Sequence, residues 1–175
     1  MSTQAMKILH SPDKRIRLVS AAAAVLTVIG LQAAGKYLFS MLSVFFSEPF
    51  SYPQTMLYSQ FASCLTWCCF LVAVLILLIR VAATGKAFTL FNVRILKIAG
   101  IILLLCLILP PVCDIATVVI FSQPEHLVSD ILITLLQSVL LYANFYTVIM
   151  ILLVALCREC VYYGTMLQTE SDETV

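Results

Sequence analysis

Two charged residues, Lys36 and Asp114, lie within apolar stretches, where an unpaired charge is costly in a membrane. Lys36 follows Arg17 by 19 residues, about 28 Å of helix, and Asp114 follows Lys97 by 17 residues, about 25 Å. If both helices cross a membrane in the same direction, the two side chains lie at similar depth. The spacing therefore predicts a pair of opposite charges. Such a pair could form a ligand or proton site or be purely structural, and Lys36 could instead extend alone to the headgroups.

Three polar residues recur every seven positions in a later apolar stretch, namely Asp130, Gln137 and Asn144. Seven residues make about two helical turns with only about 20° of drift, so the three side chains share one face of a helix. Polar side chains that face neighbouring membrane helices stabilise their association by about 0.6–2 kcal/mol each. The pattern predicts a polar seam inside a helical bundle, and a conduction path is the alternative interpretation.

The residue types that usually carry catalysis do not form a recognisable set. Cys157 and Cys160 form a CxxC pair, but no second CxxC or His pair completes a zinc site. The histidines, His10 and His126, are expected on opposite sides of the membrane. The seven cysteines fall in or beside apolar stretches and are expected to be free thiols. With no phosphate-binding loop, GxSxG or HExxH motif either, the sequence predicts no enzyme, cofactor or metal site.

The composition is that of a membrane protein. Of 175 residues, 62% are hydrophobic and 11% are charged, with a mean hydropathy of +1.07. Because a helix needs about 20 apolar residues to cross a bilayer, four spans nearly exhaust the chain. The first apolar run is too long for a cleaved signal peptide, although cleavage is the alternative. We expect an all-α integral membrane four-helix bundle forming one domain, 1–175, with spans at about 18–46, 61–79, 98–121 and 127–156.

Lysine and arginine are unevenly distributed. Five lie in the two termini, four in a central connector, residues 80–97, and none in the two other loops. Cytoplasmic segments are enriched in these residues, so we expect both termini, the connector and the tail, 157–175, in the cytoplasm. Within the connector, Gly85 should end one helix and Thr89 should cap the next. A net charge of +1 gives no broad basic surface, so no direct binding of nucleic acid is expected.

The predicted cytoplasmic face combines a basic connector, which carries Phe88 and Phe91, with an acidic tail. The two segments could pair with each other or present a docking surface for a cytoplasmic partner. The alternative is a solvated positive loop and a frayed tail with no partner.

Two stretches carry a resemblance to a known family. The connector reads GKAFT from Gly85, NVR from Asn92 and LKIAG from Leu96, and the tail reads LQTESDETV. Both resemble the motifs of a bacterial family of small four-span membrane proteins, domain of unknown function 2975. Span count, loop order and length are also similar, so the resemblance covers most of the chain. Phe91 departs from the family, whose members tend to carry a polar residue such as Glu there.

The resemblance implies a multi-pass protein of the bacterial inner membrane. Such proteins are often encoded beside a short Cro-like helix-turn-helix regulator, and membrane proteins in similar arrangements hold a DNA-binding partner inactive. By that analogy, the cytoplasmic face is expected to bind a small transcriptional regulator. The contact candidates are Gly85, Lys86, Phe88, Asn92, Arg94, Glu170, Asp172 and Glu173.

Two other classes of function remain open from the sequence. A small transporter or immunity protein would use Lys36, Asp114 and the polar seam, and would show ligand-dependent stability. A structural subunit of a larger membrane complex would be unstable without a neighbouring membrane protein. The partners considered are thus the lipid bilayer, a regulator, another membrane protein and a second copy of the chain in a homo-oligomer.

Overall fold

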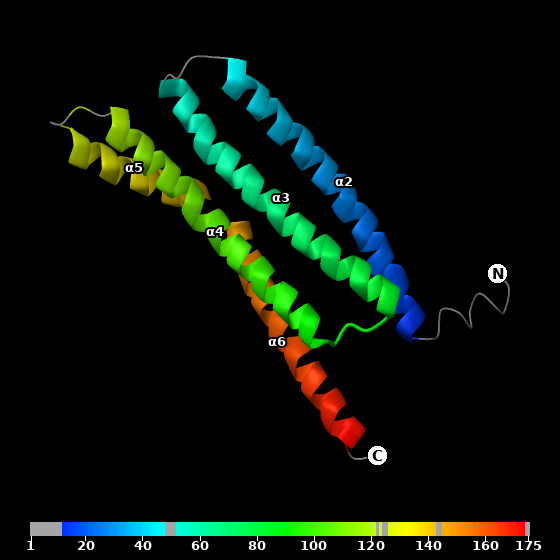
Figure 1. The fold of residues 1–175 in the computed structure, drawn as a ribbon. Helices are drawn as coiled ribbons and strands as arrows, with labels where there is room; N and C mark the ends of the chain where they lie inside the picture. Colours follow the sequence, from blue (N-terminus) through cyan, green and yellow to red (C-terminus); the bar gives the residue numbers. More distant parts are fainter. Residues whose placement is uncertain (1–11, 48–51, 122, 124–125, 143–144, 174–175) are drawn as a thin grey trace. The chain divides into compact units, whose positions relative to one another are not determined.

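The fold is described by a computed structural model that covers residues 12–47, 52–121, 123, 126–142 and 145–173 (Figure 1). Within these ranges the chain is helical except for short connections, and it contains no strand. This confirms the all-α prediction. The helices are α2 (Pro12–Ser47), α3 (Tyr52–Thr84), α4 (Leu90–Phe121), α5 (Leu127–Tyr142) and α6 (Phe145–Glu173).

Four helices are long and apolar enough to cross a membrane, as the composition predicted. Each exposes large apolar side chains that lipid can cover, because little of the four is buried within the protein. The protein therefore has the architecture of a multi-pass membrane protein. The membrane-length stretches are Lys14–Val44, Leu57–Thr84, Leu90–Phe121 and Tyr146–Ser171.

The last part of the chain differs from the single span expected at 127–156. The structure has two helices there, α5 and α6, and residues 143–144 between them lie outside the described ranges. The membrane-length stretch belongs to α6, whereas the apolar part of α5, Leu127–Gln137, is shorter. No proline or glycine interrupts this region of the sequence, so the apolar pattern alone predicted one continuous helix. The expected tail, from Cys157, is likewise helical as far as Glu173.

Contacts divide the chain into two compact units. Unit 1 contains Met1–Leu31, Leu71–Gly100 and Leu153–Val175, and unit 2 contains Gln32–Phe70 and Ile101–Leu152. The basic residues segregate between them: of the nine Lys and Arg residues in the described ranges, only Lys36 belongs to unit 2. The eight in unit 1 are Lys14, Arg15, Arg17, Arg80, Lys86, Arg94, Lys97 and Arg158.

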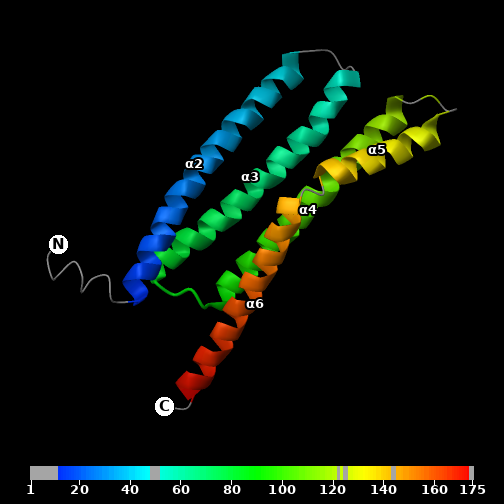
Figure 2. The same ribbon diagram turned by 180° about the vertical axis from the view of Figure 1, so that it is seen from behind.

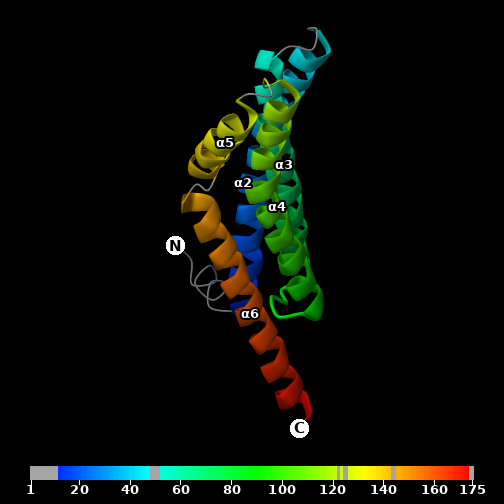
Figure 3. The same ribbon diagram turned by 90° about the vertical axis from the view of Figure 1, so that its left-hand side faces the viewer.

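Within unit 1, small residues bring helices close together. α2 and α3 lie side by side and antiparallel (Figures 1 and 2), and a Cβ added to Gly30 would lie 3.9 Å from the Leu71 side chain. α6 runs along the start of α4 (Figure 3), where a Cβ on Gly100 would lie 3.8 Å from Val154. Ala99, one residue earlier in α4, is almost completely buried.

Within unit 2, the packing centres on the middle of α4. Leu103 has an exposed fraction of 0%, and Cys106, one turn later, is also buried. α3 contributes Phe70, whose ring meets Trp67 edge-on at 5.7 Å. α3 also contacts α2 here, because the Cys64 thiol lies 3.6 Å from the carbonyl oxygen of Ala34. The burial of Leu103 and Cys106 therefore shows which face of α4 is turned toward the interior of this unit.

We expect Leu103→Ala to lower the free energy of unfolding by about 2–5 kcal/mol, because it leaves a cavity at a fully buried position. Leu104→Ala is the matched control, since Leu104 is 46% exposed and its replacement opens no enclosed space. Chemical unfolding in detergent micelles measures both. Equal losses for the two variants would contradict this description of the α4 core.

Candidate functional site

The turn Gly85–Thr89, between α3 and α4 in unit 1, contains three of the eight predicted contact residues, Gly85, Lys86 and Phe88. α3 ends at Thr84 and Gly85 has a φ of 71°, a backbone conformation that side chains with a Cβ rarely adopt. The Gly85 amide donates to the carbonyl oxygen of Val81 at 2.8 Å, which closes the helix in the manner of a left-handed C-cap. The predicted role of Gly85 as the end of a helix is thus confirmed.

Arg17 of α2 covers this end of α3. Its guanidinium group donates to the carbonyl oxygen of Thr84 at 3.2 Å, so a positive charge lies at the negative end of the helix dipole. A Cβ on Gly85 would lie 2.7 Å from Nε of Arg17. The φ of Gly85 therefore favours glycine at this position, and a larger residue would also have to displace the Arg17 side chain.

The other end of the turn begins α4 as predicted. The Thr89 hydroxyl oxygen accepts a hydrogen bond from the Asn92 amide at 3.3 Å, and the Thr89 carbonyl accepts one from Val93 at 3.2 Å. This is the geometry of an N-cap, which satisfies an amide that has no partner inside the helix.

Asn92 holds the turn against the helix that follows it. Its side-chain Nδ2 donates to the carbonyl oxygen of Ala87 at 2.7 Å and to that of Lys86 at 3.3 Å. Asn92 is 1% exposed, and its Oδ1 atom is buried without a hydrogen-bond partner. The sequence suggested Asn92 as a contact for a partner protein. Its burial instead makes it a residue that shapes the turn, because its side chain offers no surface to a partner.

Phe88 joins the turn to α6. Its ring lies directly against Gly164, where the space for a Cβ is already filled by the aromatic carbons. Phe88 is nevertheless partly exposed, so one side of its ring packs on α6 while another remains open. The only residue that allows this contact at position 164 without displacing the ring is glycine.

The surface around the turn combines basic and apolar groups. The Arg80 guanidinium carbon lies 3.7 Å from the centroid of the Phe91 ring, a cation–π contact across the turn. Phe91 thus has a partner in α3. Leu90 is 63% exposed. Three lysine and arginine side chains are also exposed here, Lys86, Arg94 and Lys97.

The acidic end of α6 belongs to the same unit. Glu170 is exposed, and the positions of Asp172 and Glu173 are helical, although their side chains lie outside the described set. Earlier in α6, Arg158 and Glu159 form an exposed ion pair with an N–O distance of 3.7 Å. Cys157 and Cys160 are free thiols at the surface of the same helix. Among the described residues, no group of three His, Cys, Asp or Glu could hold a metal ion.

The other predicted pairings lie in unit 2. Lys36 is exposed and Asp114 is half-buried, and their pairing stays a prediction. The structure does bring Asp130 and Gln137 together, since both line one cavity beside α4. Asn144, the third residue of the predicted seam, lies outside the described residues.

Several residues of these sites were not identified from the sequence. Arg17 and Gly164 act on the turn from helices that lie far from it along the chain, so no local pattern links them to it. His126 and Thr134 line the same cavity as Asp130. Their spacing of four residues on either side of Asp130 was a signal that could have found them.

Asn92→Ala should release the turn, because two carbonyl oxygens lose their donor, at a cost of about 1–3 kcal/mol. Trypsin cleavage after Lys86 in detergent-solubilised protein should then be faster than in the wild type. Arg94→Ala is the control, since Arg94 is exposed and holds no part of the turn. Unchanged cleavage of the Asn92 variant would show that the turn does not depend on this amide.

Gly164→Ala should lower stability by displacing the Phe88 ring, whereas Gly35→Ala in α2 should not. A Cβ on Gly35 meets no atom within 4 Å, so alanine there can raise helix stability by up to about 1 kcal/mol. Combining Gly164→Ala with Phe88→Ala should recover much of the loss, because the clash is then removed. Additive losses in this double-mutant cycle would contradict the contact.

Comparisons with known proteins identify no relative of this chain. No protein-family model, no curated protein and no solved structure matches the chain. The resemblance of the connector and tail to a four-span family therefore stays a prediction. The function of the turn has to be inferred from its geometry together with that resemblance.

Proposed function

We propose that this protein is a non-enzymatic, membrane-anchored binding protein whose connector docks a small helix-turn-helix transcriptional regulator and holds it at the membrane. The observation that carries the proposal is the turn Gly85–Thr89. It is fixed from three sides, by Arg17, Asn92 and Gly164, and it presents apolar and basic side chains on its outer surface.

A fixed turn is better suited to binding than a loose one. A flexible loop loses conformational entropy when it is ordered by a partner, and that loss reduces affinity. Here Asn92 and Thr89 already satisfy the backbone of the turn, so Leu90 and Arg94 are presented on the ordered start of α4. A solvated topological loop has no need of a buried amide to hold its shape.

The charges of unit 1 suit a partner with two differently charged faces. A helix-turn-helix protein has a basic surface for DNA, which the acidic end of α6 at Glu170 could cover. The basic residues Lys86 and Arg94 would meet acidic residues elsewhere on the same partner. Covering the basic surface would prevent the regulator from binding the phosphates of DNA. Docking would in this way inactivate the regulator.

The proposal places the turn, both termini and the acidic end of α6 at the cytoplasmic face of a bacterial inner membrane. The segregation of Lys and Arg into unit 1 supports this orientation, since cytoplasmic segments are rich in these residues. The choice of a regulator as the partner rests on the family resemblance. Lipid headgroups are the competing occupant for basic and aromatic side chains at a membrane surface.

A photoreactive residue at Leu90 tests the partner directly. This position is exposed and spares Phe88, which must stay packed on Gly164. Irradiation of native membranes should yield a soluble DNA-binding protein as the main adduct. The same probe at Ile101, an exposed apolar position later in α4, is the control and should capture lipid or membrane proteins. Identical adducts from the two positions would refute docking at the turn.

Charge reversal then tests the docking surface. Arg94→Glu should reduce co-purification of the regulator at least tenfold, because it puts a repulsive charge on the exposed start of α4, next to the fixed turn. Lys36→Glu reverses a charge at an exposed position of α2 that belongs to unit 2, and should leave recovery intact. Equal recovery with both variants would show that the connector does not contact the regulator.

A further inference from the structure

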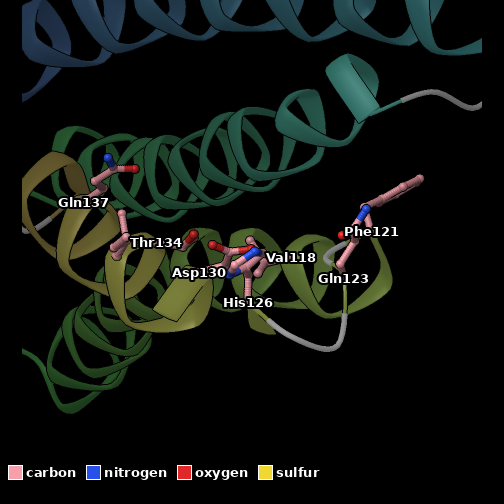
Figure 4. A pocket seen from close by; sticks show the side chains of 8 residues that line it. Val118, Phe121, Gln123, His126, Asp130, Thr134 and Gln137 are labelled. Carbon is pink, nitrogen blue, oxygen red and sulfur yellow. The ribbon is translucent and has the colours of Figure 1, made fainter. Parts of the chain in front are cut away.

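Unit 2 contains a cavity of about 440 Å³ beside the end of α4 and the start of α5 (Figure 4). α5 supplies four of the eight lining residues, and Val118 of α4 lies near His126 and Asp130 in the view of Figure 4. The volume lies in the range of about 300–1,000 Å³ that is usual for small-molecule sites. The lining residues are Val118, Phe121, Gln123, His126, Asp130, Ile133, Thr134 and Gln137.

Four polar side chains that line the cavity lie along the first part of α5 and on the residue just before it. His126, Asp130, Thr134 and Gln137 are spaced by four, four and three residues, which keeps them on one face of the helix. They extend over 11 residues, about 16 Å of helix. Ionisable and polar residues in an otherwise apolar helix of a membrane protein mark a candidate ligand site.

The chemistry of the lining indicates a cation. Asp130 brings a carboxylate, and none of the eight described lining residues is Lys or Arg. Asp130 and Thr134 are half-buried, whereas His126 and Gln137 are exposed at the two ends. A partly buried carboxylate attracts a positive charge more strongly than one in bulk water. The flanking imidazole, hydroxyl and amide can hydrogen-bond to an ammonium group or to a second polar group of the same ligand.

We propose that this cavity binds a small organic cation with an ammonium group. Asp130 pairs with the ammonium group, Thr134 and Gln137 hydrogen-bond along the ligand, and Val118 and Ile133 contact its carbon chain. The site lies in unit 2, and its residues take no part in the turn that is proposed to dock a regulator. The proposed binding site can therefore be tested independently of the proposed docking function.

The test uses the full chain in lipid nanodiscs and putrescine as the probe. Putrescine should raise the melting temperature in a saturable manner, whereas butane-1,4-diol, its uncharged counterpart, should not. Asp130→Asn should weaken the apparent affinity for putrescine at least tenfold. The absence of saturable stabilisation of the wild type, or an equal effect of the diol, would overturn the proposal.

Two further variants separate binding from folding. Asp130 lies in the first turn of α5, where a carboxylate also stabilises the helix, so the readout is the putrescine-dependent shift and not the basal melting temperature. Asp114→Asn removes the other acidic residue described in unit 2, which does not line the cavity, and should keep the shift. Thr134→Leu narrows the cavity without changing its charge and should weaken binding. A shift retained by Asp130→Asn, or lost equally in Asp114→Asn, would contradict the assigned site.

Discussion

The side-chain amide of Asn92 bonds two backbone carbonyl oxygens in the turn between α3 and α4, and the polar end of unit 1 depends on it. A chain that leaves one helix and enters the next exposes backbone groups that those helices no longer satisfy. Arg17, Thr89 and Asn92 supply the missing partners. Because these groups bond within the protein, the side chains of the turn remain available at its surface, which is the condition for a docking site.

The parts of this turn that were predictable are the local ones. Gly85 and Thr89 act on residues within four positions of themselves, so the residue type alone indicated a helix end and a helix start. Arg17 bonds to a residue 67 positions away, and Phe88 packs on a glycine in the last helix. Such contacts depend on which helices are neighbours and how each is rotated, and one sequence contains no record of either.

The same distinction explains the polar residues in the apolar stretches. The seven-residue period correctly placed Asp130 and Gln137 on one face, because helical geometry alone decides that. The prediction that Lys36 and Asp114 form an ion pair was based on their similar depth in the membrane. Depth gives the position of a side chain along the membrane normal but not its position in the plane of the membrane. The two charges can lie at the same depth and still face different directions, so depth alone does not make them a pair.

α4 is common to the turn and to the cavity, since it carries Asn92 near one end and Val118 near the other. Along α4 itself, binding at one site would affect the other by displacing the helix. Pro110 and Pro111 lie between the two sites and remove two backbone hydrogen bonds from the helix. A bend there costs less than elsewhere in α4, so a small displacement at the cavity is absorbed before it reaches the turn. The prolines thus favour two sites that bind independently over one coupled site.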